Sequence, residues 1–334
     1  MPGPKRPGRG TPRRMTARSG RLVLPTPSPD ARVDLHLHST ASDGTATPTE
    51  LVVAAKSLGL AAIALSDHDS IGGVREAMAA GAEHGVEVLP SVEIGIAHDP
   101  DRGLVEVDVH GYLVDPENEE LTGVLDRLQV AKNRKLDRQI AVLAENGMPI
   151  DRNEVLAIAN GDTVRRPHIW KVLHEHHPDL AAEEFFDRTS FGGDWHVTKE
   201  FSLTLEECVA LVERAGGVPV LAHPGAYNAT FAKTGELIDP AVDDAIRLCA
   251  GAGMKGIEVY YTYDKNRPFY NAEPLITKGE LGTLIAHYEE MAESLGLLRT
   301  GGTDYHGTSK PQISIGEIDV PYRLVSDLKA AAGR

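Results

Sequence analysis

Short apolar runs that alternate with helical segments constrain the fold of this 334-residue chain more than any other feature. The first unit shows the pattern. Residues 33–38 (VDLHLH) alternate with the period of a strand, and Thr47, Pro48 and Glu50 then supply an N-cap, a first-turn proline and a capping-box acid for a helix. Repeated strand-then-helix units predict an α/β protein with a mostly parallel sheet, either a barrel or a doubly wound sheet.

The same alternation continues along the chain and is interrupted once. It predicts strands over 61–66, 86–94, 104–114, 218–222, 256–261 and 297–300, and helices over 73–84, 205–215, 240–252 and 283–295. Pro90 predicts a bend in its strand or a place at the sheet edge. From 115 to 200 the pattern is mainly helical, with a long amphipathic stretch at 121–146. We therefore predict a discontinuous barrel domain (32–114 and 201–334) with a helical insertion (115–200).

Composition narrows the classes of partner. Residues 1–31 are rich in proline, glycine and arginine, which predicts a disordered basic tail. The net charge of the chain is −15, so the remainder is more acidic still, and we expect no stable binding of duplex nucleic acid. The two cysteines exclude a disulfide framework and a cysteine-rich zinc site. We find no membrane-length apolar run and no signal peptide, which predicts no membrane partner and a cytoplasmic location.

Imidazole and carboxylate side chains gather at one kind of place, the ends of the predicted strands. Parallel α/β folds place their functional sites at the carboxyl ends of strands, so these residues should meet. A lone histidine in such a place is more often structural than a ligand, but nine convergent residues reverse that balance. The nine candidate metal ligands are His36, His38, Asp43, His68, Glu93, His110, His223, Asp304 and His306.

The chemistry of these donors points to borderline and hard divalent cations. Nitrogen and oxygen ligands without thiolates suit Zn²⁺, Mn²⁺ or Fe²⁺. Nine ligands exceed the need of one ion, which predicts two or three. Three divalent ions, the carboxylates of Asp43, Glu93 and Asp304, and a bridging hydroxide would leave a charge of about +2, which matches a phosphate dianion. Asp67 and Asp69 are expected to orient imidazoles rather than bind a metal directly.

These motifs, taken together, resemble the PHP family, named for polymerase and histidinol phosphatase domains. The resemblance rests on His36-x-His38, Ser66-Asp67-His68-Asp69, Glu93, His110-Gly111-Tyr112, Ala222-His223-Pro224 and Gly302-Thr303-Asp304-Tyr305-His306. It implies a distorted seven-stranded β/α barrel with a trinuclear metal centre. In that centre, His36, His38, Glu93 and Asp304 would hold one ion, Asp43, His68 and His306 a second, and His110 and His223 a third, with Glu93 bridging.

The insertion resembles that of the branch containing nucleoside 3′,5′-bisphosphate phosphatases, AMP phosphatases and 5′–3′ exoribonucleases. The branch signature is Arg166-Pro167-His168 before a helix, which implies a cap whose Arg166 and His168 bind the substrate phosphate. Arg134 on the long helix is a further candidate, with a surface ion pair as its alternative. Trp195, Tyr227 and Tyr263 could stack on a base, although plain packing is favoured for each.

The expected activity is metal-dependent hydrolysis of a phosphomonoester. A metal-bound hydroxide would attack phosphorus, with Asp304 in the catalytic centre and His223 or His306 as candidates to protonate the leaving oxygen. The expected substrate is AMP, a 3′,5′-bisphosphate or the 5′ end of a short RNA. Two alternatives stay open: a C–N or lactone hydrolase of the amidohydrolase type, and a metal-binding module without catalysis.

Overall fold

The strands of the protein form one sheet that curls into a barrel. The computed structural model describes residues 27–159, 164–226, 236–265 and 276–334. In space the strands follow the order β7-β6-β5-β4-β3-β2-β1-β8. Their bounds are β1 Arg32–Leu37, β2 Ala62–Leu65, β3 Glu87–Gly95, β4 Asp108–Tyr112, β5 Val218–Leu221, β6 Gly256–Tyr261, β7 Leu298–Gly302 and β8 Val320–Pro321.

The barrel closes where the end of β7 meets β1. Leu37 forms a parallel bridge with Tyr305, and the Asp304 amide donates to the His36 carbonyl at 2.9 Å. A side chain on Gly302 would collide with the backbone of His36, so this glycine lets the two strands approach. The short β8 pairs antiparallel with the start of β1. The prediction of a distorted seven-stranded barrel is confirmed, with β8 as an added strand.

One strand runs against the others, which the sequence pattern did not predict. β4 is antiparallel to both β3 and β5, and it covers a shorter range than the predicted 104–114. His110 therefore does not lie at the carboxyl end of a parallel strand. It lies mid-strand, directly opposite Glu93 in the pairing register. Pro90 lies in the interior of the sheet rather than at its edge, where β3 passes from β2 to β4 as its partner.

The helices largely match the predicted segments. The capping box of Thr47 and Glu50 is present at the start of α1, and Thr204 with Glu207 forms another at α7. The helix bounds are α1 Pro48–Ser57, α2 Val74–His84, α3 Glu119–Glu145, α4 Arg152–Ala159, α5 Arg166–His176, α6 Ala182–Thr189, α7 Leu205–Arg214, α9 Pro240–Gly251, α10 Lys278–Leu295 and α11 Arg323–Ala331, with short 3₁₀ turns at Pro100–Arg102 and Gly307–Ser309.

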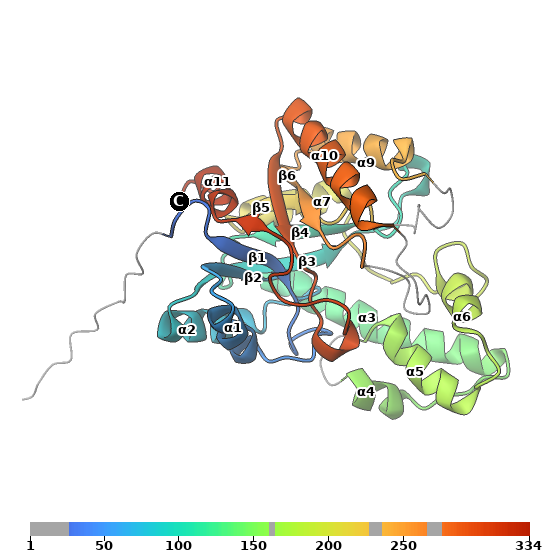
Figure 1. The fold of residues 1–334 in the computed structure, drawn as a ribbon. Helices are drawn as coiled ribbons and strands as arrows, with labels where there is room; N and C mark the ends of the chain where they lie inside the picture. The colour runs from blue at the N-terminus through green and yellow to red at the C-terminus, as the bar shows by residue number, and fades with distance from the viewer. Residues whose placement is uncertain (1–26, 160–163, 227–235, 266–275) are drawn as a thin grey trace, which may run out of the picture.

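The described part of the segment 115–200 consists of helices joined by turns and loops, without a strand, and has a core of its own. Its long helix α3 runs from the barrel into the group formed by α4, α5 and α6 (Figure 1). Leu121, Leu125 and Leu128 pack into the barrel core, whereas Leu136 and Leu143 belong to a separate cluster with residues of the following helices. α3 is therefore one continuous helix that connects the core of the barrel to the core of the insertion.

Two remaining predictions concern the N-terminal tail and membrane-spanning helices. Most of the predicted basic tail (residues 1–26) lies outside the described residues. Among the helices that the structure describes, none combines the length and apolar character needed to cross a bilayer.

Candidate metal centre

The two histidines of β1 form the middle of a buried cluster. They lie two residues apart, so their side chains leave the same face of the strand. The Nε2 atoms of His36 and His38 are 3.0 Å apart. Asp304 Oδ1 lies 3.4 and 3.1 Å from these two nitrogens, and Glu93 Oε2 lies 3.5 and 3.3 Å from them. Four donor atoms from three strand ends thus converge on one small volume.

A second group surrounds Asp43, in the loop after β1. Its carboxylate lies 3.7 Å from His38 Nδ1, 3.9 Å from His68 Nε2 and 3.3 Å from His306 Nε2. The His38 ring stacks between the other two, with centroids 4.4 Å from His68 and 4.1 Å from His306. His38 therefore faces both groups and joins them.

Glu93 lies between these two groups and a third group, which His110 and His223 form. Its Oε1 lies 3.0 Å from His223 Nε2, and its Oε2 lies 2.9 Å from His68 Nδ1. His110 reaches the same place from β4, with its ring perpendicular to the His36 ring and the two ring centroids 4.3 Å apart. All nine predicted ligand residues are buried and lie in this one connected cluster.

The sequence reading missed one buried member of the cluster, Glu258 of β6. Its carboxylate accepts from the His223 amide at 2.9 Å and lies 3.1 Å from His36 Nδ1. It also lies 3.6 Å from His110 Nε2. A carboxylate on the outer nitrogen of an imidazole fixes the tautomer and turns the inner nitrogen toward a metal. The available signal was an acid in the apolar strand GIEVYY, where an unpaired carboxylate would be costly.

Asp304 is held by contacts on both of its oxygens. Oδ1 faces the imidazoles, while Oδ2 accepts from the Tyr261 hydroxyl at 2.7 Å and from Lys310 Nζ at 2.6 Å. Its backbone has φ +55°, a left-handed conformation that non-glycine residues seldom adopt. Such backbone strain recurs at functional sites, where the surrounding contacts maintain it.

The charges in the cluster support one another. Burial disfavours the ionised forms of Glu93 and Asp304, but neighbouring cationic groups outweigh it and hold both pKa values well below their usual range. Burial likewise opposes protonation of His36, yet the carboxylates of Glu258, Asp304 and Glu93 raise its pKa. At neutral pH the centre therefore presents ionised carboxylates, as metal binding requires.

The donor set fits divalent cations. His38 Nδ1 and His110 Nδ1 are buried without a hydrogen bond to any described residue. Such orphaned nitrogens are costly unless a bound group satisfies them. Imidazole lone pairs and carboxylates that converge without thiolates match the preferences of Zn²⁺, Mn²⁺ and Fe²⁺.

The insertion brings cationic and imidazole groups to the cluster, but not all of those predicted. Arg165, not Arg166, approaches it, with Nε 3.6 Å from Asp43 Oδ2. Arg166 instead contacts Ser190 Oγ at 2.6 Å and Glu106 at 3.2 Å. His168 is buried, and its Nδ1 accepts from the Arg165 amide. Arg134 is not brought to the site, because it lies exposed on α3 and pairs with Glu200 at 2.9 Å.

The proposed orienting aspartates have other partners. Asp67 accepts hydrogen bonds from Ser39 and Ser42, which fixes the loop after β1 rather than an imidazole. Asp69 pairs with Lys132 of α3 at 2.7 Å.

None of the three aromatic residues considered for base stacking is seen at the cluster as an open ring in the described part of the chain. Trp195 and Tyr263 are both buried in packing contacts, and Tyr227 lies outside the described residues.

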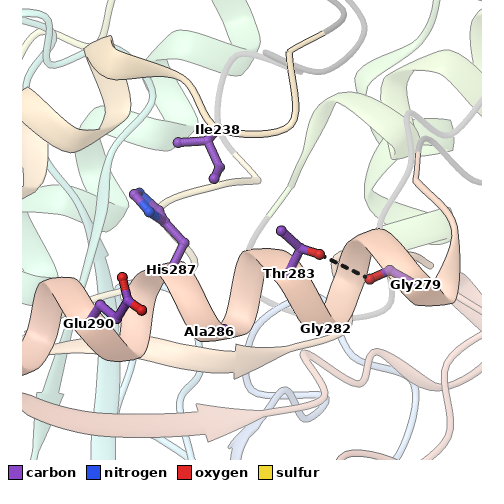
Figure 2. Close-up of a pocket in the computed structure, with 7 residues that line it drawn as sticks. All are labelled: Ile238, Gly279, Gly282, Thr283, Ala286, His287 and Glu290. Carbon is purple, nitrogen blue, oxygen red and sulfur yellow. Dashed lines mark hydrogen bonds between the residues drawn. The ribbon is translucent and has the colours of Figure 1, made fainter.

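A groove elsewhere on the surface has little of this chemistry. Figure 2 shows it along α10, an open space of about 550 Å³ that includes Ile238, Thr283, His287 and Glu290 in its lining. His287 already pairs with Asp243 at 2.7 Å. The strand-end cluster is therefore the better candidate for the functional site.

Comparison with known proteins agrees with this geometry. The model of the PHP domain matches residues 34–210, which carry most of the cluster. The chain belongs to the PHP domain family. The family match confirms the resemblance inferred from the motifs.

PHP relatives with named activities cover most of the chain. A 5′-3′ exoribonuclease of Haemophilus influenzae is 29% identical over 71% of this chain and 82% of its own length. A 3′,5′-nucleoside bisphosphate phosphatase of Chromobacterium violaceum is 28% identical over 86% of this chain and 92% of its own. The prediction of a PHP-type phosphoric ester hydrolase is confirmed at this level.

A solved structure has the same fold. It is described as an amidohydrolase from Chromobacterium violaceum with bound sulfate and no metal. It has a TM-score of 0.70 and 25% identity, over 90% of this chain and 96% of that one.

Proposed function

We propose that this chain hydrolyses a phosphomonoester of a nucleotide, either AMP, a 3′,5′-bisphosphate or the 5′ end of a short RNA. The observation that carries the proposal is the meeting of two parts of the chain. A buried histidine–carboxylate cluster at the barrel mouth lies beside Arg165 and His168 of the insertion. The activities named for the relatives favour the same substrate class.

The nine predicted ligands, His36, His38, Asp43, His68, Glu93, His110, His223, Asp304 and His306, would hold two or three divalent cations. When bound, such cations supply Lewis-acid activation of water and neutralise phosphoryl oxygens. Glu258 would orient His36, and Tyr261 and Lys310 would orient Asp304, through the hydrogen bonds described above.

Around the phosphate, Arg165 would provide a permanently charged donor, since its guanidinium already lies at the cluster, 3.6 Å from Asp43. His168 stays neutral at pH 7, because burial lowers its pKa to about 4, and it would serve as a hydrogen-bonding group rather than a charge. His223 and His306 remain the candidates for protonating the leaving oxygen.

The test is phosphate release by chelator-treated protein resupplied with Mn²⁺. The substrates are AMP, 3′,5′-bisphosphoadenosine, a 5′-phosphorylated short RNA, an amide and a lactone. We expect release from at least one nucleotide and its loss in Asp304→Asn. Hydrolysis of the amide or lactone alone would favour the amidohydrolase alternative, and full metal occupancy without any hydrolysis would favour the non-catalytic one.

A further inference from the structure

Three rings from two parts of the chain gather beside the insertion. His98 lies in the loop after β3 of the barrel, while Phe191 and His196 follow α6 in the insertion. The rings of His98 and Phe191 stack with centroids 4.7 Å apart and planes 10° apart. His196 meets both edge-on, at 5.7 and 5.5 Å. We call His98, Phe191 and His196 the aromatic platform.

The platform has an exposed apolar face. Phe191 is 38% exposed, one of few large apolar side chains in the described residues to be so open. A single exposed apolar residue is unremarkable in itself. Phe191, however, contacts two imidazoles, one stacked on its ring and one edge-on.

The imidazoles of the platform are uncharged at neutral pH. Burial lowers the pKa of His98 to about 4, and burial also lowers the pKa of His196. The platform therefore offers neutral π faces, which favour stacking of a flat ring over attraction of an anion.

Cationic side chains lie close to the platform, because the charges of Lys135 and Lys199 act on His98 and those of Lys135 and Arg166 act on His196. Lys199 Nζ donates to the carbonyl of Gly95, two residues beyond Glu93. Burial and the charges of Arg166 and Lys199 lower the pKa of Lys135 to about 8, which shows how closely these cations are grouped. Glu106 pairs with Arg166 at 3.2 Å and offsets part of the charge. Lys135, Lys199 and Arg166 thus place three positive charges near the platform histidines, against the one negative charge of Glu106.

The metal centre, the cations and the aromatic rings match the phosphate, the sugar-phosphate portion and the base of a nucleotide. Phosphate oxygens need the metal centre and cations, and every base has a π face that stacks on an aromatic ring. We propose that the aromatic platform binds the nucleobase of the substrate, with Phe191 as the stacking residue and Lys135 and Lys199 beside the sugar-phosphate portion. This inference rests on the proposed function and adds the residue that distinguishes a nucleotide from a simple phosphate ester.

The test compares two nucleotide substrates with a sugar phosphate that lacks the base. Each variant is assayed with AMP, with 5′-phosphorylated ApA and with ribose 5-phosphate, in the same Mn²⁺-loaded protein. Phe191→Leu keeps apolar bulk but removes the ring, and Phe191→Tyr keeps the ring. Met78→Ala, at an exposed apolar residue of α2, is the control for a surface change elsewhere.

We expect Phe191→Leu to lower the ratio of kcat/KM for a nucleotide over that for ribose 5-phosphate by about tenfold to a hundredfold, mainly through KM. Phe191→Tyr and Met78→Ala should keep the wild-type ratio. A ratio in Phe191→Leu equal to wild type for both nucleotides would overturn the platform while leaving the proposed function intact. Wild-type protein that hydrolyses neither these three substrates nor 3′,5′-bisphosphoadenosine would overturn the proposed function and this inference together.

Discussion

Neighbouring residues in this chain have different surroundings, and the pair Arg165 and Arg166 is the clearest case. Arg165 is the N-cap residue of α5, and its side chain turns toward Asp43 of the barrel. Arg166 is the first residue of the helix and contacts Ser190 and Glu106 instead. One residue advances a helix by about 100°, so adjacent arginines at a helix start face different parts of the protein.

We expect Arg165→Ala to lower kcat/KM for the best nucleotide substrate by about a hundredfold, because it removes the guanidinium that the insertion places beside the cluster. Arg166→Ala should have a smaller effect, since its guanidinium is already paired. Steady-state kinetics of both variants, with metal content measured in each, provides the comparison. A larger loss in Arg166→Ala at full metal occupancy would show that Arg166, as the sequence motif implies, is the phosphate-binding arginine.

At the scale of elements, α3 joins two cores that are otherwise separate. Its N-terminal half is buried against β-strands and α7 of the barrel, and its C-terminal half is buried among α4, α5 and α6. Cavities at the two ends should therefore affect different parts of the molecule, although both residues belong to one helix.

Leu143→Ala and Leu125→Ala test this division, since both side chains are buried. A leucine-to-alanine cavity costs about 2–5 kcal/mol. We expect Leu143→Ala to accelerate proteolysis within the insertion while the barrel keeps its metal. Leu125→Ala should lower the free energy of unfolding of the barrel and of the helix that it anchors. Equal proteolysis of insertion and barrel in Leu143→Ala would show that the two cores unfold as one unit.

At the scale of the whole molecule, buried histidines couple stability to pH. Burial lowers the pKa values of His98 and His168 to about 4. In an unfolded chain an imidazole binds its proton near pH 6.5. Between about pH 6.5 and 4 the unfolded chain therefore binds more protons than the folded one, and stability falls as pH falls. His36 and His223, whose pKa values are raised, stay protonated in both states over this range and lose their contribution only at higher pH.

The free energy of unfolding of metal-free protein should accordingly decrease from pH 7 to pH 4.5. Urea unfolding with chelator present measures it. The double variant His98→Gln and His168→Gln should show a shallower decrease, and His84→Gln at the end of α2 serves as the matched histidine control. A slope unchanged in the double variant would mean that other groups cause the acid sensitivity.

The sequence by itself determined the family of the fold and the composition of the centre. Alternating apolar runs, capping residues and glycines are local signals, and each follows from backbone geometry over a few residues. The nine candidate ligands could be predicted for the same reason, because eight of them follow or end strands whose direction the pattern predicts. His110 was included through its motif, although the strand that carries it runs the other way.

Only the tertiary structure decided which side chains meet. Glu258 joins the cluster because β6 lies beside β5 and β7, and Arg165 replaces Arg166 because α5 docks in one orientation on the barrel. The platform of His98, Phe191 and His196 combines residues about a hundred positions apart. Such contacts depend on how whole elements pack, and packing is set by the sum of many weak interactions across the core rather than by any local pattern.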